Sequence, residues 1–143
     1  MTTATKPSVL FWIVAVLALL WNLFGVLMFW QNLAMTPEAI AALPDAQRQV
    51  TLARPDWTFV PFGIGTVAGA LGSLGLLLCR RWAVPLLLLS LLGTALLFGA
   101  IYAVTPVWSL MGARGAVFPV VLVLIGLFLW LYARRSATRG WLH

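Results

Sequence analysis

The side chains that could carry out chemistry are few in this chain and lie far apart in the sequence. Its side-chain carboxylates are Glu38, Asp45 and Asp56, its one cysteine is Cys79, and its one histidine is His143. These residues do not assemble into a Ser-His-Asp set, a pair of catalytic carboxylates or a metal-ligand cluster, and the glycines form no phosphate-binding loop. We therefore expect no enzymatic activity, no metal site and no cofactor.

Polar side chains inside otherwise apolar segments are the remaining candidates for a binding site. Asn22, Thr66 and Thr94 each lie eight or nine residues from one end of an apolar segment. If the segments are helices, this spacing corresponds to a depth of about 12–14 Å. Two interpretations stay open: Asn22 hydrogen-bonds a neighbouring helix and fixes its register, or the three residues form a small site for a solute, with Trp21 as an aromatic wall. We favour the first.

Four long apolar segments must position these residues: Val9–Trp30, Trp57–Leu78, Trp82–Tyr102 and Ala116–Tyr132. Each is long enough, or nearly so, to cross a hydrocarbon core of about 30 Å as a helix. None contains Asp, Glu, His, Lys or Arg. Proton-coupled transport normally needs an Asp, Glu or His within the membrane to take up and release the proton. The sequence predicts an all-α membrane protein with one domain over residues 1–143, in which four transmembrane helices form an antiparallel bundle.

The composition agrees with a membrane protein. Apolar residues make up 63% of the chain and charged residues 8%, against roughly 45–50% and about 25% in soluble domains. The net charge of +6 does not indicate nucleic acid binding, because the basic residues are divided among short loops and tails. Positive charge in such places is typical of loops held in the cytoplasm.

The basic residues also predict the orientation of the helices. One side of the predicted bundle carries six of them and no acidic residue: Lys6, Arg80, Arg81, Arg134, Arg135 and Arg139. On the other side, Arg48, Arg54 and Arg114 are balanced by the three carboxylates. By the positive-inside rule, both termini are expected in the cytoplasm.

Small residues mark the predicted contacts between helices. Gly65, Gly69 and Ser73 follow one another at intervals of four in the second segment, and Gly25 lies on the same face of the first segment as Asn22. Small residues at this spacing let two helix backbones approach closely within a membrane. We expect these four residues to pack helices together.

The long link between the first two segments, residues 31–56, also carries a helical pattern. Thr36, Pro37 and Glu38 supply a hydroxyl cap, a proline at the first position and an acid in the first turn, and apolar residues then recur at helical spacing. Pro44 is expected to divide this helix. The sequence predicts a helical outer loop that lies on the membrane surface or caps the bundle; a partly ordered connector is the alternative.

Seven of the eight tryptophans lie near predicted segment ends, in the outer loop or in the tail, where an indole settles at the level of the lipid headgroups. Among these, Trp141 is expected at the membrane interface. The exception is Trp21, near the middle of the first segment.

Several stretches carry a resemblance to a known family: Trp21-Asn22-Leu23-Phe24-Gly25-Val26, Met35-Thr36-Pro37-Glu38, Gly69-Ala70-Leu71-Gly72, Arg81-Trp82-Ala83-Val84-Pro85, Ser90-Leu91-Leu92-Gly93 and Gly140-Trp141. They are similar to a family of small bacterial membrane proteins with four transmembrane helices, some of which carry an automated "sugar transporter" label. The resemblance implies the bacterial inner membrane as the location. It brings no established mechanism.

Two hypotheses of function follow. The first is a small inner-membrane protein without enzymatic chemistry that binds a partner or acts as an accessory protein; its candidate partners, besides the lipid bilayer, are a second copy of the chain and another membrane protein. The second is an oligomeric transporter or facilitator of a solute, a sugar by the family label, because one copy with four helices encloses little volume and shows no internal repeat. For the second, Trp21, Asn22, Thr66 and Thr94 are the candidate ligand-binding residues.

Overall fold

The computed structural model describes residues 6–105, 107–112 and 114–143, and within these ranges the chain forms seven α-helices and no strand. The long helices are α1 (Val9–Leu33), α4 (Phe59–Leu77), α5 (Ala83–Val104) and α7 (Arg114–Thr138). The short ones are α2 (Pro37–Ala41), α3 (Asp45–Ala53) and α6 (Val107–Met111), and a 3-10 turn, η1 (Asp56–Thr58), leads into α4. The four long helices are apolar enough to cross a membrane, which indicates a multi-pass membrane protein.

The ends of the long helices follow local chemistry as well as hydropathy. Helix α1 begins after Ser8, whose Oγ accepts a hydrogen bond from the Phe11 N–H at 3.2 Å. Helix α7 continues six residues beyond the predicted apolar segment, from Tyr132 to Thr138. Its last turn contains no glycine or proline, and Gly140 then ends it with a φ of 79°.

The link between α1 and α4 is helical, as predicted, and Pro44 separates its two helices. Thr36 caps α2 by accepting a hydrogen bond from the Ala39 N–H at 3.2 Å, and Pro37 occupies the first helical position. Helix α3 begins immediately after Pro44. A further short helix, α6, lies in the link between α5 and α7, where the sequence predicted only a loop.

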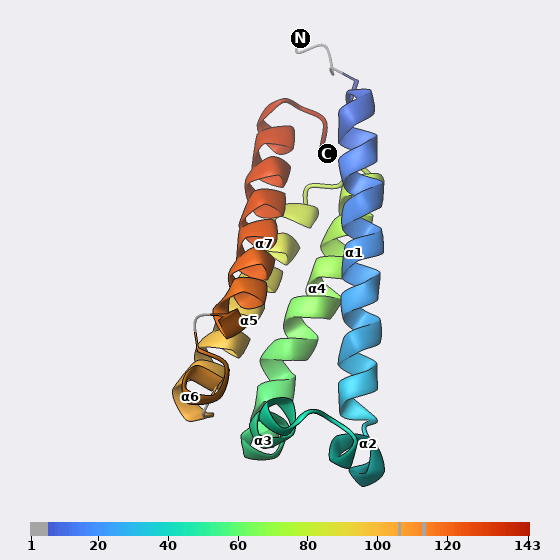
Figure 1. Ribbon diagram of the computed structural model, residues 1–143. Helices are drawn as coiled ribbons and strands as arrows, with labels where there is room; N and C mark the ends of the chain where they lie inside the picture. The colour runs from blue at the N-terminus through green and yellow to red at the C-terminus, as the bar shows by residue number, and fades with distance from the viewer. Residues whose placement is uncertain (1–5, 106, 113) are drawn as a thin grey trace.

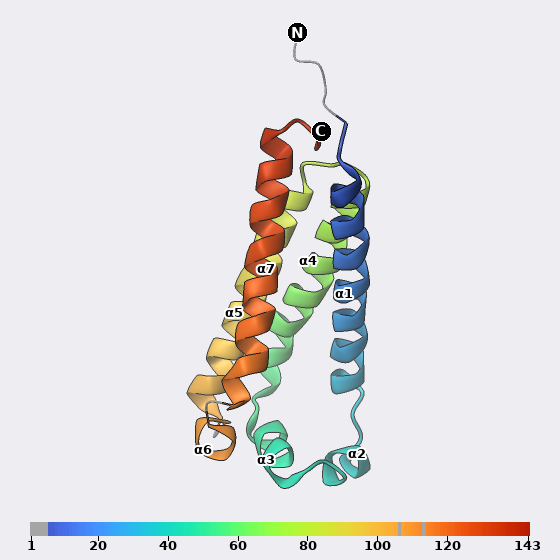
Figure 2. The ribbon, with the colours of Figure 1, turned by 45° about the horizontal axis from the view of Figure 1, so that its top comes forward.

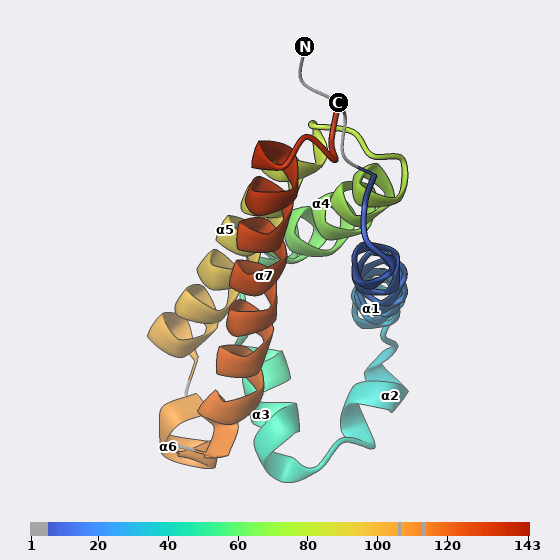
Figure 3. The same ribbon diagram turned by 90° about the horizontal axis from the view of Figure 1, so that it is seen from above.

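The long helices pack in the order in which they occur in the chain. Helix α4 packs against both α1 and α5, and α5 packs against α7, whereas α1 and α7 make little direct contact. Figures 1 and 2 show the helices side by side, and in Figure 3, seen from above, α1 stands apart from α7 with α4 and α5 behind them. Helix α4 is the most buried of the long helices, with eight buried residues against six in α5 and three in α7, and it forms the centre of the molecule.

The two ends of the molecule hold different parts of the chain (Figure 1). We use "tail end" for the end that holds the start of α1, the link 78–82 between α4 and α5, and the C-terminal residues 139–143. We use "loop end" for the end that holds α2, α3 and α6.

Candidate functional site

A cavity of about 390 Å³ lies among the four long helices and extends toward the loop end. Trp21 and Asn22 of α1, Thr66 of α4 and Thr94 of α5 all line it. The structure thus brings the four predicted ligand-binding residues together, although it does not test whether they bind a ligand. Helix α7 contributes the remaining wall, which is apolar and includes Phe118, Leu122 and Ile125.

The Asn22 amide joins α1 to α4. Its Nδ2 donates to the Ser73 Oγ of α4 at 3.0 Å and to the Ala18 carbonyl of its own helix at 2.8 Å. The Ser73 hydroxyl in turn donates to the Gly69 carbonyl at 2.8 Å. Both amide hydrogens of Asn22 are thereby used within the protein, as expected of an amide that fixes the register of two helices in lipid.

The hydroxyl groups near the cavity are mostly occupied as well. Thr66 donates to the Phe62 carbonyl at 3.0 Å within α4, and Ser90 of α5 donates to the Gly65 carbonyl of α4 at 2.6 Å. The Thr94 hydroxyl makes no hydrogen bond with any other described residue. The cavity therefore offers a ligand few free polar groups.

The predicted packing residues lie where helices meet. A Cβ on Gly69 would collide with the Asn22 Oδ1 of α1 and lie 2.8 Å from the Ser90 Oγ of α5. A Cβ on Gly65 would lie 2.9 Å from the Thr94 Oγ1 of α5, and one on Gly25 would lie 3.3 Å from Thr66 of α4. Helix α4 can hold two neighbours at once because small residues face both of them.

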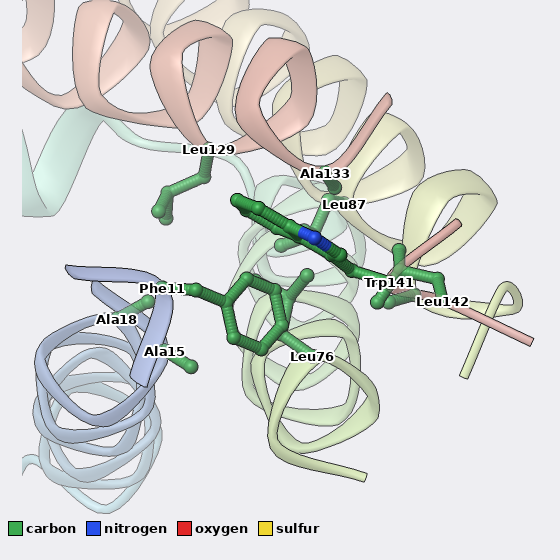
Figure 4. Packing of buried hydrophobic residues seen from close by; sticks show 10 residues of the cluster. Phe11, Ala15, Ala18, Leu76, Leu87, Leu129, Ala133, Trp141 and Leu142 are labelled. Carbon is green, nitrogen blue, oxygen red and sulfur yellow. The ribbon is translucent and has the colours of Figure 1, made fainter. Parts of the chain in front are cut away.

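An aromatic and aliphatic cluster closes the tail end. Phe11 of α1 is fully buried, with its ring centroid 5.6 Å from that of Trp141 in an edge-to-face arrangement. In Figure 4, the Trp141 ring lies between Phe11 and the α7 residue Ala133. The cluster continues into Leu76 of α4 and Leu87 of α5. Tail residues thus fill, at this end, the space that α1 and α7 leave between them.

Two helix ends hold the tail in place. After α7, the Trp141 N–H bonds the Ser136 carbonyl at 3.0 Å around Gly140; after α4, the Arg80 N–H bonds the Gly75 carbonyl at 2.8 Å around Cys79. Both are hydrogen bonds of the Schellman type, which reverse the chain at a left-handed residue. The reversed segments then pair: the His143 N–H donates to the Cys79 carbonyl at 2.8 Å, and the Arg81 N–H donates to the His143 carbonyl at 3.0 Å.

Trp141 therefore has a role that the sequence did not predict. We expected it, like the other terminal tryptophans, at the level of the lipid headgroups; in addition, only 8% of it is exposed and it belongs to the core cluster. Glycine at position 140, in the left-handed conformation, is the signal that the chain turns back before Trp141.

Arg54 lies at the loop end of the cavity, and sequence reasoning counted it only in the charge balance. It follows α3 directly, and its guanidinium carbon lies 4.6 Å from the centre of the Phe59 ring. Burial lowers the pKa of the Arg54 guanidinium. No periodicity could have placed it here, because its position depends on how α3 folds back over the bundle.

Groups for covalent or metal chemistry do not gather in the cavity. Among the residues that the structure describes, no three His, Cys, Asp or Glu side chains lie close enough to hold a metal ion. Cys79 lies in the link at the tail end, and burial raises the pKa of its thiol, which favours the less reactive protonated form.

Comparisons with protein-family models, with curated protein sequences and with solved structures give no match to this chain.

Proposed function

We propose that this protein is an accessory protein of a bacterial inner membrane that performs no enzymatic reaction and acts by binding a partner molecule within the bilayer. The observation that carries the proposal is the cavity: α1 and α7 stay apart along the loop-end half of the bundle, and the space between them is lined mainly by apolar side chains. A membrane molecule reaches such a site from the side, without crossing water.

The proposed orientation places the tail end in the cytoplasm. The described basic residues Lys6, Arg80, Arg81, Arg134, Arg135 and Arg139 belong to this end, whereas Glu38, Asp45 and Asp56 belong to the loop end. By the positive-inside rule, this distribution favours an antiparallel bundle with both termini inside. Reporter fusions after His143 and within Ala41–Thr51 test the assignment; a cytoplasmic signal from the second fusion would overturn it.

Cross-linking in membranes tests the binding function. A photo-reactive residue placed at Phe24 of α1 or Phe118 of α7 faces the cavity mouth, because both residues line the cavity and are exposed. Leu92 of α5 is equally exposed but lies away from the cavity, so it serves as the control position. We expect a discrete adduct, identified by mass spectrometry, from the first two positions only. Identical adducts from all three positions would contradict partner binding at the cavity.

A solute facilitator is the second candidate, and one observation favours it: Trp21, Asn22, Thr66 and Thr94 line one cavity. A sugar site needs more polar groups than this cavity leaves free, so we rank it second. Uptake of labelled monosaccharides into liposomes that contain the purified protein tests it. Uptake above that of empty vesicles that is lost in Asn22→Ala would promote the transporter and remove the purely structural interpretation of Asn22.

A further inference from the structure

Arg54 is a cation at the rim of an apolar space. Its side chain is partly buried and lines the cavity, and its described contact is with the face of Phe59. The ion pair found in the described part of the chain joins Arg48 to Asp45, and no described carboxylate lies within ion-pair distance of Arg54. An arginine stays charged at neutral pH even when partly buried, so this site attracts an anion.

The cavity below Arg54 has the length of one membrane leaflet. Its lining runs from Trp21 to Asn32 along α1 and from Phe118 to Leu129 along α7. Each of these stretches corresponds to about 16 Å of helix, close to half of a hydrocarbon core of about 30 Å. Leu87 and Leu129 belong both to the cavity lining and to the tail-end cluster, so the space ends there.

The walls suit a hydrocarbon chain better than a polar solute. The amide hydrogens of Asn22 and the hydroxyl of Thr66 are bonded within the protein. Phe24 and Phe118 are exposed at the two sides of the mouth, so the cavity communicates with the surrounding lipid. A volume of about 390 Å³ lies near the lower limit of the roughly 300–1,000 Å³ typical of ligand sites, which favours one chain over two.

We propose that the cavity binds a long-chain fatty acid, with its carboxylate on the Arg54 guanidinium and its single acyl chain between α1 and α7. The planar fork of arginine matches the two oxygens of a carboxylate. The proposal rests on the proposed function, since it names the partner molecule that the cavity takes from the bilayer.

Photo-reactive palmitate and photo-reactive hexadecanol, which share one chain length, test the proposal with the full-length protein in phosphatidylcholine nanodiscs. We expect palmitate to label cavity peptides at a concentration about tenfold or more below that needed for hexadecanol, because the charged head adds a charge-assisted hydrogen bond. Arg54→Gln should abolish this preference and Arg54→Lys should keep part of it. Arg114→Gln, the same charge change at an exposed arginine outside the cavity, should leave it intact.

A variant that fills the cavity, with a matched control, tests partner binding at the cavity separately from recognition of a carboxylate. Leu122→Trp fills the lining of the cavity and should reduce labelling by both probes, whereas Leu127→Trp on the exposed side of α7 should not. Thermal stability in detergent confirms that each variant is folded.

Four results would overturn the fatty-acid site. Equal labelling by the two probes, or equal effects of Arg54→Gln and Arg114→Gln, would show that no carboxylate is recognised; the binding function would survive if Leu122→Trp still reduced labelling. Stronger competition by lysophosphatidylglycerol than by palmitate would replace the carboxylate with a lipid phosphate. If neither probe labels the cavity, the fatty-acid proposal fails, and the binding function fails with it when Phe24 and Phe118 also yield no specific adduct.

Discussion

The tail end and the loop end of this bundle are built differently, although the same four long helices run through both. At the tail end, the returning tail places Trp141 against Phe11, and the helices are joined through a filled core. At the loop end, α1 and α7 stay apart and line a cavity together with α4 and α5. In a membrane, helices associate through the fit of their surfaces and through hydrogen bonds, because lipid covers apolar surface equally well. Whether a region is closed or open is therefore decided by shape rather than by hydrophobicity.

Replacing two phenylalanines of α1, one in the tail-end cluster and one in the cavity wall, gives the largest expected contrast. Phe11→Ala leaves a void in the buried cluster, and such truncations cost about 3–5 kcal/mol. Phe24 is 56% exposed in the wall of the cavity, so Phe24→Ala should cost about 0.5 kcal/mol or less. The free energy of unfolding, measured by SDS titration in detergent micelles, compares the two. Equal losses would mean that the tail end is no better packed than the loop end.

Two glycines provide the next contrast. A Cβ on Gly69 meets side chains of both α1 and α5, so Gly69→Ala should destabilise the bundle by about 1–3 kcal/mol through overpacking. Gly99 of α5 has nothing within 4 Å of the corresponding position. Gly99→Ala should therefore leave the stability unchanged or raise it, since alanine is the better helix former. Thermal denaturation in detergent measures both, and an unchanged midpoint for Gly69→Ala would remove α4 from the centre of the packing.

Much of this fold could be predicted because hydropathy and capping residues act locally. The four apolar segments, the helix start at Thr36 and the break at Pro44 follow from the side chains at those positions. Which helices would stay apart could not be predicted, because the separation of α1 from α7 depends on the fit of whole helix surfaces. The burial of Trp141 depends in addition on contacts between residues far apart in the sequence.

The candidate site, like the fold, could be predicted only in part from the sequence. Counting residues along each segment placed Asn22, Thr66 and Thr94 at one depth, and all three line the cavity. The residue spacing could not predict that the Asn22 amide would donate both its hydrogens to Ser73 and Ala18, which leaves neither of them for a ligand. Nor could it place Arg54 at the rim, since α3 is short and its direction depends on tertiary contacts.

Two asparagines of α1 test how the helices are joined between the two ends. Asn22→Ala removes the hydrogen bond to Ser73 of α4 and should cost about 0.6–2 kcal/mol. Asn32→Ala is the control for stability, because within the described part of the chain the Asn32 amide donates only to the Met28 carbonyl of its own helix. The free energy of unfolding, measured by SDS titration, should fall in Asn22→Ala and not in Asn32→Ala. Palmitate labelling of the cavity per folded molecule should stay the same in both variants. A loss of labelling in Asn22→Ala at unchanged stability would make Asn22 a ligand-binding residue instead.

Trp21, compared with the buried Trp141, gives the smallest expected effect on stability and a direct test of ligand binding at the loop end. Trp141 fills the tail end, whereas Trp21 is 39% exposed and lines the cavity without a described hydrogen bond. Trp21→Leu should therefore change the free energy of unfolding by no more than about 0.5 kcal/mol.

If the indole forms a wall of an occupied site, the same substitution should weaken palmitate labelling several-fold, because a flat wall against the acyl chain is lost. Unchanged labelling would mean that the chain packs elsewhere in the cavity, and a large loss of stability would mean that Trp21 belongs to the helix packing. If the loop end binds a ligand, Trp21→Leu should reduce labelling without reducing stability. Phe11 lies in the buried cluster, so its replacement should reduce stability first.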